Sequence, residues 1–525
     1  MSSVAPDRVC VVVGRTRHKM AVAEIYEAVK RGGKFIELRL DFLSKAVEFQ
    51  RLLQIKQCPW VATIRRPSEG GRWAGSEEAR QTLLRQTIVS GAFDWVDLET
   101  DIAESVRRFG SVKRIVSYHN MTETPSDLES IYAQMLRQDA DVYKIAVMAQ
   151  TMADCGRVMA IQKAAKRPTV AFCMGEIGVP TRYLALKHGA PWIYAAFNSE
   201  RGLAPGMPAV EDFRTTYPVH SINAETAVYG VIGDPVGHSY SPVLHNHMFR
   251  KHKFNAIYLP FRVPKDELAD ALRTFEAVPV SGYSVTIPHK EKAAEITTDH
   301  DLTVRMTSAA NTLLRKPDGT FSADNTDLTA VIDCIEAHLF DTAAKKAAAQ
   351  LNQMYVLVLG AGGAARAVAH ALHARKAHIY ISSRTLDRAT KLAEEVGCKA
   401  MDWGARHSVT PCDVIVNCTP VGMHPNIKES PIHPSFFKPE MTVFDTVYNP
   451  ESTLLLRDAQ ARGCKTITGV EMFVRQAARQ FQLFTGIAPP IEAMRDLLKK
   501  AMSPVSRMVD EVEETGAPAE GDDDD

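Results

Sequence analysis

Short apolar runs recur along roughly the first 200 residues, with more polar stretches between them. The runs cover residues 9–13, 34–41, 60–65, 95–99, 114–119, 142–149, 169–174 and 192–197. Most intervening stretches, such as 20–30, 77–90, 127–138 and 153–165, place apolar residues at helical spacing. Eight buried-type strands that alternate with helices predict a parallel (β/α)8 barrel, with an open doubly wound sheet as the alternative.

A barrel of this kind gathers its chemistry at the carboxyl ends of its strands. Charged side chains and a histidine lie in or just after those ends: Glu37, Arg39, Arg65, Glu99, His119, Lys144 and Arg182. The spacing therefore predicts that these side chains converge on one site. The arginines suit bidentate binding of a carboxylate, although each alone is equally consistent with a structural ion pair.

Lys144 stands inside an otherwise apolar strand, between Tyr143 and Ile145. Burial lowers the pKa of a lysine and frees its amine to attack a carbonyl carbon. A nearby His119 would then transfer protons. The alternatives are a lysine that reaches solvent or pairs with Glu37, and a histidine satisfied within the core.

Five motifs follow one another in this half. They are Glu-Leu-Arg-Leu-Asp (37–41), Thr-Ile-Arg…Glu-Gly-Gly (63–71), Ser-Tyr-His-Asn (117–120), Tyr-Lys-Ile-Ala (143–146) and Gly-x-x-Gly-x-x-Thr-Arg (175–182). Together they resemble type I 3-dehydroquinate dehydratase over nearly all of residues 9–213. The resemblance implies that Lys144 forms an imine with the substrate ketone and that His119 is the acid–base. It also implies that the substrate is bound by Glu37, Arg39, Arg65 and Arg182, with Glu99 in a supporting role.

One loop departs from that family. The family commonly closes its site with Ser-Ala-Pro-Gly-Gln, whereas this chain has Leu203-Ala204-Pro205-Gly206-Met207. Two polar substrate contacts are thus replaced by apolar side chains. A first half with impaired dehydration is therefore an alternative.

Residues 211–227 contain Pro218, show no clear period, and predict a short linker. From Tyr229 an apolar strand runs to Gly233, and a loop with Ser239 and Ser241 follows it. Paired hydroxyls after a strand suit a polar ligand, and an ordinary turn is the alternative.

A further strand from residue 282 runs into a proline-stopped turn with Thr286 and Lys290 at its end. Small polar clusters follow at residues 309–312 and 323–327. Lys290 and Asp327 form a candidate acid–base pair, because a carboxylate beside an amine keeps it protonated and oriented. A surface salt bridge is the alternative.

Residues 355–366 match a dinucleotide-binding fingerprint. A hydrophobic strand enters Gly360-x-Gly362-x-x-Ala365, and a helix follows to Leu372. Such glycines let backbone amides approach a pyrophosphate at a helix N-terminus. The next strand, 378–381, ends in Ser-Ser-Arg-Thr, where Arg384 with its hydroxyl neighbours favours the 2′-phosphate of NADP. An arginine at the start of a helix is the alternative.

The second half has its own ordered motifs: Gly-His-Ser-x-Ser-Pro, Val-Thr-Ile-Pro-His-Lys, Ala-Asn-Thr, Asp-Asn-Thr-Asp, Gly-Ala-Gly-Gly-Ala, Cys-Thr-Pro-x-Gly-Met and Gly-x-x-Met-x-x-x-Gln. Over about 229–500 the chain is similar to shikimate dehydrogenase. The resemblance implies that Lys290 and Asp327 are catalytic. It implies that shikimate is bound by Ser239, Ser241, Thr286, Asn311, Tyr448 and Gln476. It implies an NADP site lined by Gly360, Ala361, Gly362, Gly363, Ala364, Ser383, Arg384, Thr385, Thr446 and Gly469.

Two positions depart from the bacterial shikimate dehydrogenases: Ser284 replaces a frequent Asn, and Leu328 replaces a frequent Gly. Ser at the first position also occurs in plant-type fused enzymes.

The whole chain resembles the fused 3-dehydroquinate dehydratase–shikimate dehydrogenases of plants. This predicts an α/β chain with a TIM barrel at 1–218, an α/β substrate domain at 226–335, a Rossmann-type NADP domain at 336–485, a helix returning to the substrate domain at 486–503, and a disordered acidic tail at 504–525. The first half would dehydrate 3-dehydroquinate, and the second would reduce 3-dehydroshikimate to shikimate with NADPH. A reductase that uses quinate and a metabolite-binding regulator without turnover are the alternatives.

Charge and cysteine content limit the partners. Lys+Arg and Asp+Glu balance at 62 each in 525 residues, which gives no field that favours nucleic acid or a membrane surface. The nine cysteines form no Cys-x-x-Cys, which suits free thiols in a reducing cytosol and no metal site. No apolar run approaches the length of a membrane span, and few residues precede the first strand. We therefore expect a cytoplasmic protein whose partners are small-molecule substrates, with its oligomeric state left open.

Overall fold

The computed structural model describes residues 5–274, 278–339 and 351–503. The tail predicted at 504–525 lies outside these residues, as do residues 341–350, whose alanine- and lysine-rich sequence predicts a helix. The chain folds into two compact units. The first comprises the residues up to Pro242 together with Phe249–Ser281, and the second comprises Val243–Met248 and the residues from Gly282 onward.

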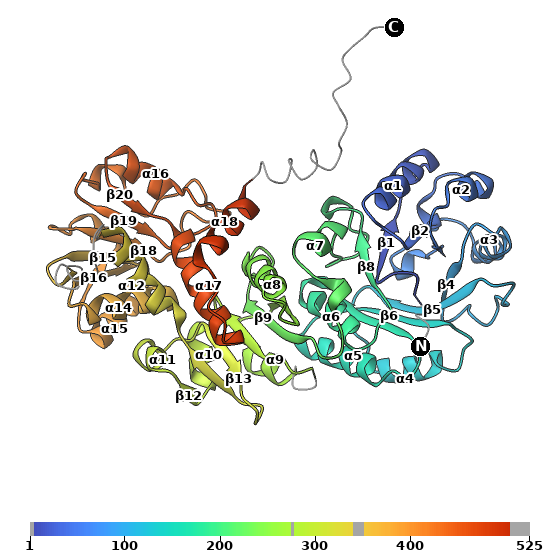
Figure 1. Ribbon diagram of the computed structural model, residues 1–525, viewed down its shortest axis with the longest axis horizontal. Coiled ribbons are helices and arrows are strands. Elements are labelled where there is room, and N and C mark those ends of the chain that lie inside the picture. Colours follow the sequence, from blue (N-terminus) through green and yellow to red (C-terminus); the bar gives the residue numbers. More distant parts are fainter. Residues whose placement is uncertain (1–4, 275–277, 340–350, 504–525) are drawn as a thin grey trace, which may run out of the picture. The chain divides into compact units, whose positions relative to one another are not determined.

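The first unit contains an eight-stranded parallel sheet that curls into a nearly closed barrel (Figure 1). Its strands are β1 (Val9–Val13), β2 (Ile36–Arg39), β3 (Trp60–Thr63), β4 (Trp95–Glu99), β5 (Lys113–Asn120), β6 (Val142–Met148), β7 (Thr169–Met174) and β8 (Ile193–Ala196). Their order is β7-β6-β5-β4-β3-β2-β1-β8, so β1 pairs with β8 as well as with β2. Every predicted strand is confirmed to within a few residues, and the alternative of an open doubly wound sheet is excluded.

Helices surround these strands on the outside (Figure 1). They are α1 (His18–Lys30), α2 (Phe49–Ile55), α3 (Glu77–Val89), α4 (Leu128–Met135), α5 (Met152–Ala164) and α6 (Gly175–Lys187). The four predicted helical stretches correspond to α1, α3, α4 and α5. The spacing argument missed α2, which buries only Leu52, and α6, which contains Pro180.

Strand register brings polar residues of neighbouring strands to one height in the barrel. Ser117 on β5 pairs with Glu99 on β4 and with Lys144 on β6. Because side chains alternate along a strand, Asp97 shares a face with Glu99, just as Glu37 shares one with Arg39.

The rest of the first unit follows the barrel. Here α7 (Val210–Thr215) precedes the parallel pair β9 (Ala227–Gly233) and β10 (Ala256–Arg262), which are joined through α8 (Ser241–Lys251). α9 (Leu268–Thr274) packs against α5, and β10 against α6. The predicted strand end at Gly233 is confirmed, and the predicted linker 211–227 contains most of α7 at its start and ends where β9 begins.

The second unit begins with four strands in the order β11-β13-β14-β12. These are β11 (Gly282–Val285), β12 (Asp299–His300), β13 (Thr312–Arg315) and β14 (Phe321–Asp324). The helices of this region are α10 (Lys290–Ile296), α11 (Leu302–Thr307) and α12 (Thr326–Leu339). α10 begins at Lys290 and α12 begins one residue before Asp327, so both candidate catalytic residues lie in first turns.

The remainder is a six-stranded parallel sheet of Rossmann type. Its strands are β15 (Tyr355–Leu359), β16 (His378–Ser383), β17 (Lys399–Asp402), β18 (Val414–Asn417), β19 (Thr442–Asp445) and β20 (Lys465–Ile467), in the order β17-β16-β15-β18-β19-β20. The helices are α14 (Gly363–Ala374), α15 (Leu386–Val396), α16 (Leu454–Ala461), α17 (Gly469–Thr485) and α18 (Ile491–Met502).

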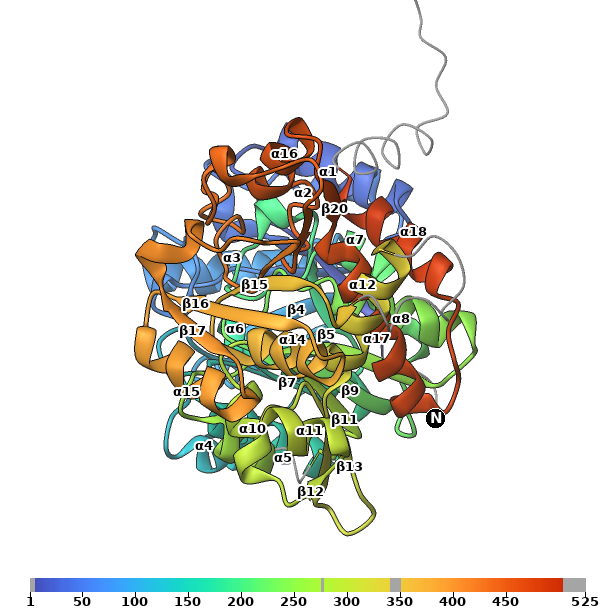
Figure 2. The same cartoon turned by 90° about the vertical axis from the view of Figure 1, so that its left-hand side faces the viewer.

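Both faces of this sheet are covered. Val356 and Val358 join the core formed with α12, α14 and α15, and Figure 2 shows α14 and α15 beside β15–β17. Leu357 and Leu359 join the core on the other face, with α16. The strand order reverses between β15 and β18, and ligands of open α/β sheets bind at such a switch point.

Within residues 5–274, 278–339 and 351–503, none of the helices has the length and hydropathy of a membrane span. All nine cysteines are free thiols.

Candidate active sites

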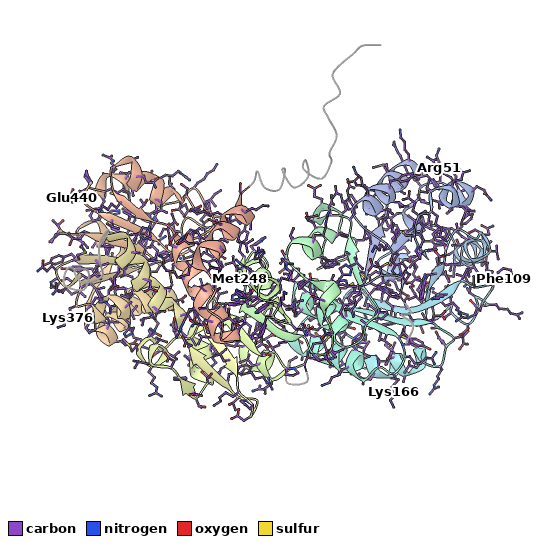
Figure 3. The ribbon with its side chains drawn as sticks, in the orientation of Figure 1. Arg51, Phe109, Lys166, Met248, Lys376 and Glu440 are labelled. Carbon is purple, nitrogen blue, oxygen red and sulfur yellow. The ribbon has the colours of Figure 1, made fainter. Side chains whose placement is uncertain are left out.

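A cavity opens among the strand ends of the barrel. All six of the residues predicted to react or bind there line it: Glu37, Arg39, Arg65, His119, Lys144 and Arg182. Glu99 is buried and lies 3.4 Å from Arg65 and 2.7 Å from Arg80. The exposed side chains of Arg51 and Phe109, labelled in Figure 3, project from the periphery of the barrel, well apart from this charged interior.

The amine of Lys144 is held on three sides. Its Nζ lies 3.2 Å from Asp97 Oδ2, 3.8 Å from Glu37 Oε2 and 4.2 Å from the centroid of the Tyr194 ring. Lys144 is 6% exposed, so little water screens these contacts. The amine is buried as predicted, and it is enclosed by two carboxylates and the face of an aromatic ring.

Asp97 joins the reactive amine to an arginine. Arg65 Nη2 lies 2.8 Å from Asp97 Oδ1, and Ser117 donates to the same carboxylate at 2.5 Å. Burial alone would raise the pKa of Asp97, but Arg65 and Lys144 outweigh it and hold that pKa below its ordinary value. Asp97 is therefore a fixed negative charge. Arg65, with Asp97, Glu99 and Glu69 around it, chiefly organises these carboxylates.

His119 forms a pair with Glu69. His119 Nδ1 lies 3.2 Å from Glu69 Oε2. Burial and the nearby Arg65 and Lys144 lower the pKa of His119, so the ring is neutral near pH 7. Burial raises the pKa of Glu69 to about 7. A neutral imidazole oriented by a carboxylate suits proton transfer at its other nitrogen.

The two remaining arginines differ in their surroundings. Arg39 donates to both oxygens of Asp41, at 2.9 and 2.8 Å, so its charge is already compensated. Arg182 is 2% exposed and donates through Nη2 to the carbonyl of Pro205 at 3.1 Å. Its buried Nε and Nη1 have no hydrogen-bond partner among the described residues, and burial lowers its pKa to about 10. An anion in the cavity would satisfy these donors.

The loop with the altered sequence covers this cavity. Leu203, Ala204 and Met207 contribute to its lining, as the motif comparison predicted. The loop is fixed by a hydrogen bond from Gly175 N to the carbonyl of Pro205 (3.2 Å) and by the contact of Arg182. Gly206 has φ +69, and a Cβ there would lie 2.6 Å from the Gly175 carbonyl oxygen, so a glycine is required.

Sequence reasoning missed Asp97 and Tyr194 as contacts of Lys144 and gave Glu69 no role. Alternation along β4 places Asp97 on the same face as Glu99, which the strand-end argument selects. Tyr194 carries no such signal, because an aromatic residue in a barrel strand is ordinarily core.

The second unit brings Lys290 and Asp327 together. Lys290 Nζ lies 2.6 Å from Asp327 Oδ2, and their side chains are 16% and 4% exposed. The surface salt bridge offered as the alternative does not fit this burial. Asn311 donates to Asp327 Oδ1 at 2.9 Å, so both carboxylate oxygens are held.

A buried amide extends this network to α17. Gln480 donates to the carbonyl of Asn311 at 2.9 Å and to Thr312 at 3.0 Å, and it accepts from Ser284 at 2.7 Å. Ser284, noted as a departure, is therefore satisfied by Gln480. No sequence motif selects Gln480, which lies one turn after the predicted Gln476.

The glycine turn after β15 has the form that a dinucleotide requires. Gly360 has φ +113, and a Cβ there would lie 3.1 Å from the Cys418 carbonyl oxygen. Gly362 precedes α14, and no atom lies within 4 Å of a Cβ built there. Ala361 lies between these glycines, and Gly363 and Ala364 follow them. Residues 362–364 are half-buried, so the backbone amides at the start of α14 are accessible to a pyrophosphate.

Arg384 follows β16 and is exposed together with Thr385, while Ser383 is half-buried. Over the residues that the structure describes, the Arg384 guanidinium makes no hydrogen bond or ion pair. A free cation and two hydroxyls at this place fit a 2′-phosphate. Gly360 and Ala361 are buried, whereas residues 362–364 and 383–385 are partly or fully exposed. The residues present fit NADP.

Other predicted cofactor and substrate residues lie at α17 and the strand ends. A Cβ on Gly469 would lie 2.8 Å from the Thr446 carbonyl oxygen, so these two positions touch. Tyr448 stacks on Phe473 with ring centroids 4.2 Å apart, and Gln476 donates to the Phe473 carbonyl at 2.9 Å.

Thr286 follows β11 and is half-buried. In the first unit, the amide of Ser241 donates to Ser239 Oγ at 3.2 Å.

Models of known families match four stretches of the chain. Residues 9–224 match type I 3-dehydroquinase. Residues 231–313 match the shikimate dehydrogenase substrate binding domain. Residues 342–445 match shikimate/quinate 5-dehydrogenase, and residues 469–499 match the shikimate 5′-dehydrogenase C-terminal domain.

Whole proteins with both parts are also similar. A bifunctional 3-dehydroquinate dehydratase/shikimate dehydrogenase, chloroplastic, of Arabidopsis thaliana is 36% identical over 513 residues, which is 94% of this chain and 85% of the relative. The shikimate biosynthesis protein AroDE of Chlamydia pneumoniae is 29% identical over 483 residues, or 90% of this chain and 94% of the relative. A crystal structure of a shikimate dehydrogenase in complex with NADP+ is 32% identical, covers 54% of this chain and 97% of its own, and has a TM-score of 0.48.

Proposed function

The chain belongs to the family of bifunctional 3-dehydroquinate dehydratase/shikimate dehydrogenases, and we propose on that premise which residues perform each reaction. The first half is a type I 3-dehydroquinase, a lyase. The second half is a shikimate dehydrogenase that uses NADP. Together they catalyse two steps of the shikimate pathway.

In the barrel, Lys144 adds to the ketone carbon of 3-dehydroquinate. The carbonyl oxygen leaves as water after taking up two protons, and a protonated imine remains. Its positive charge acidifies the adjacent C–H, and neutral His119 takes that proton and then delivers one to the hydroxyl that departs as water. Water hydrolyses the imine, which releases 3-dehydroshikimate and restores the Lys144 amine.

The observation that carries this assignment is the unsatisfied guanidinium of Arg182. Its buried Nε and Nη1 have no partner among the described residues, and Arg182 lines the cavity that also contains Lys144 and His119. The substrate carboxylate would pair with them in bidentate fashion. Glu37, Arg39 and Arg65 complete the polar wall, with Glu37 on the ring hydroxyls.

In the second unit, Lys290 protonates the carbonyl oxygen of 3-dehydroshikimate while its carbon is reduced. NADPH, when bound, supplies the hydride. Asp327 accepts a hydrogen bond from the amine of Lys290 and orients it, and Asn311 holds Asp327 in turn.

The remaining assignments follow the motifs. We assign shikimate binding to Ser239, Ser241, Thr286, Asn311, Tyr448 and Gln476. We assign the NADP site to Gly360, Ala361, Gly362, Gly363, Ala364, Ser383, Arg384, Thr385, Thr446 and Gly469. The domain boundaries 1–218, 226–335, 336–485 and 486–503 belong to the same proposal.

A cytoplasmic location is also a proposal. It is supported by the nine free thiols, which suit a reducing compartment.

In the test, the purified chain is supplied with 3-dehydroquinate and NADPH, and the absorbance of NADPH is followed. Oxidation requires both sites in series, since the first substrate must lose water before it can be reduced. Lys144→Ala should abolish oxidation with 3-dehydroquinate and retain it with 3-dehydroshikimate, whereas Lys290→Ala should lose both. No turnover of either substrate by the unaltered chain would contradict the assignment.

Quinate is the competing substrate of the reductase, since the matched family model covers both shikimate and quinate enzymes. Initial rates of NADP+ reduction with shikimate and with quinate decide between them. We expect shikimate to be strongly preferred, because Ser241 and Thr286 are both retained.

A further inference from the structure

We propose that Tyr194 is a positioning residue of the barrel site, whose ring face holds the cationic nitrogen of Lys144 before and after the imine forms. The proposal rests on the imine chemistry assigned above. No family motif named above includes Tyr194.

The geometry places the ring directly beside the reacting atom. Tyr194 lies on β8, is 2% exposed and lines the cavity. Lys144 Nζ is 4.2 Å from the centroid of its ring, well inside the roughly 6 Å over which an aromatic face attracts a cation. The carboxylates of Asp97 and Glu37 approach the same nitrogen.

The hydrogen bonds to the carboxylates and the cation–π contact to the ring are affected differently when the ammonium group becomes an imine. An ammonium group has three N–H donors, which suffice for both carboxylates. A protonated imine has one N–H, so only one carboxylate can still accept a hydrogen bond from it. A cation–π contact needs no N–H and therefore persists in the imine. The ring also cannot take up the proton that keeps the imine electrophilic.

The ring, and not the hydroxyl, is the active part. The Tyr194 hydroxyl has no hydrogen-bond partner within the described part of the chain. Burial raises the pKa of this hydroxyl well above its usual value, so it stays protonated. Trp192 and Phe172 pack against Tyr194, with ring centroids 6.1 and 6.2 Å from its own, and fix its orientation.

The alternative is that Tyr194 only fills the core, and three variants of the full chain separate the two roles. Tyr194→Phe keeps the ring face and removes the hydroxyl. Replacement by 3,4,5-trifluorophenylalanine keeps the shape of that Phe variant and weakens the attraction of the ring for a cation. Tyr194→Leu removes the ring.

Dehydratase kcat and KM are measured for each variant. The amount of Lys144 imine formed with 3-dehydroshikimate is measured by borohydride trapping and mass spectrometry. The reductase activity of the same preparation reports whether the chain is folded.

We expect Tyr194→Phe to retain kcat within about twofold. The trifluorinated and Leu variants should lose about 10-fold in kcat and in trapped imine, with KM little changed. Equal activity of the Phe and trifluorophenylalanine variants would overturn the proposal, as would a Phe variant as impaired as Leu. Absence of a trapped adduct on Lys144 of the unaltered chain would instead remove the imine chemistry on which the proposal stands.

Discussion

Gly363 packs directly against the stem of Lys290. A Cβ added to Gly363 would lie 3.0 Å from Lys290 Cδ and 3.1 Å from its Cβ. Gly363 is the first residue of α14, and Lys290 is the first residue of α10. The glycine turn proposed to bind the pyrophosphate therefore also sets the position of the proposed proton donor.

Gly363→Ala should lower the reductase kcat. The new methyl group would displace the Lys290 stem, and a misplaced catalytic group costs roughly 10-fold or more. Thermal stability should not fall, because alanine favours a helix more than glycine does. The measurement is kcat at saturating NADPH, alongside a melting curve.

Gly362→Ala is the matched control, since no atom lies within 4 Å of a Cβ at that position. It should raise the KM for NADPH, because the added methyl group hinders the close approach of the pyrophosphate. It should leave kcat nearly unchanged. Equal effects of both variants on kcat would show that Lys290 is not positioned by Gly363.

Arg384→Ala should shift the reductase away from NADPH. Losing a charge-assisted contact to the 2′-phosphate should cost about 10- to 100-fold in kcat/KM for NADPH and leave the value for NADH unchanged. Arg388 is the control, since it is also exposed but pairs with Glu291 at 3.2 Å. If Arg388→Ala changed the ratio of kcat/KM for NADPH to kcat/KM for NADH as much as Arg384→Ala does, the assignment of Arg384 would be wrong.

The strands of both units were predictable because their apolar runs are short and bounded by polar or turn residues. Helix α6 was not predictable in this way, since it contains Pro180 and is buried on most sides. Proline within a helical pattern normally indicates its end. The barrel packing overrides that preference here.

The candidate residues were predictable where a charge interrupts an apolar strand, as Lys144 does. The residues that contact these candidates were less predictable from the sequence. Glu69 is distant from His119 in sequence, and Gln480 reaches Asn311 only because α17 packs beside β13. Such pairings depend on tertiary structure and leave no local pattern.

Asp97→Asn should impair the dehydratase by about 100-fold. The substitution keeps the shape and removes the negative charge beside Lys144 and Arg65, so the cationic imine loses its nearest counter-charge. Glu99→Gln is the control, since Glu99 is equally buried and pairs with Arg65 and Arg80 at 3.4 and 2.7 Å. Comparable losses of kcat in both variants would mean that Asp97 acts only through stability.

Restoring polar side chains to the lid should improve the dehydratase. Leu203→Ser with Met207→Gln would supply two donors to the cavity, and each neutral hydrogen bond is worth about 1 kcal/mol, or roughly fivefold in affinity. The KM for 3-dehydroquinate should fall. Leu203 lies against Gly14, so the melting temperature is measured in parallel. An unchanged or higher KM in a folded double variant would show that the apolar lid does not limit binding.

Dehydratase activity should decline as the pH falls through about 7. Burial raises the pKa of Glu69 to about 7, so Glu69 is ionised above that pH and neutral below it. The carboxylate accepts from the Nδ1–H of His119 more strongly than the neutral acid does, and it can stabilise the imidazolium that forms during proton transfer. His119 has a lowered pKa and does not titrate in this range.

Glu69→Gln should therefore lower the rate above pH 7 and flatten the profile between pH 6 and 8. The reductase activity of the same chain, measured across the same range, separates this effect from a general loss of folding. A Gln variant that kept the decline near pH 7 would assign it to a group other than Glu69.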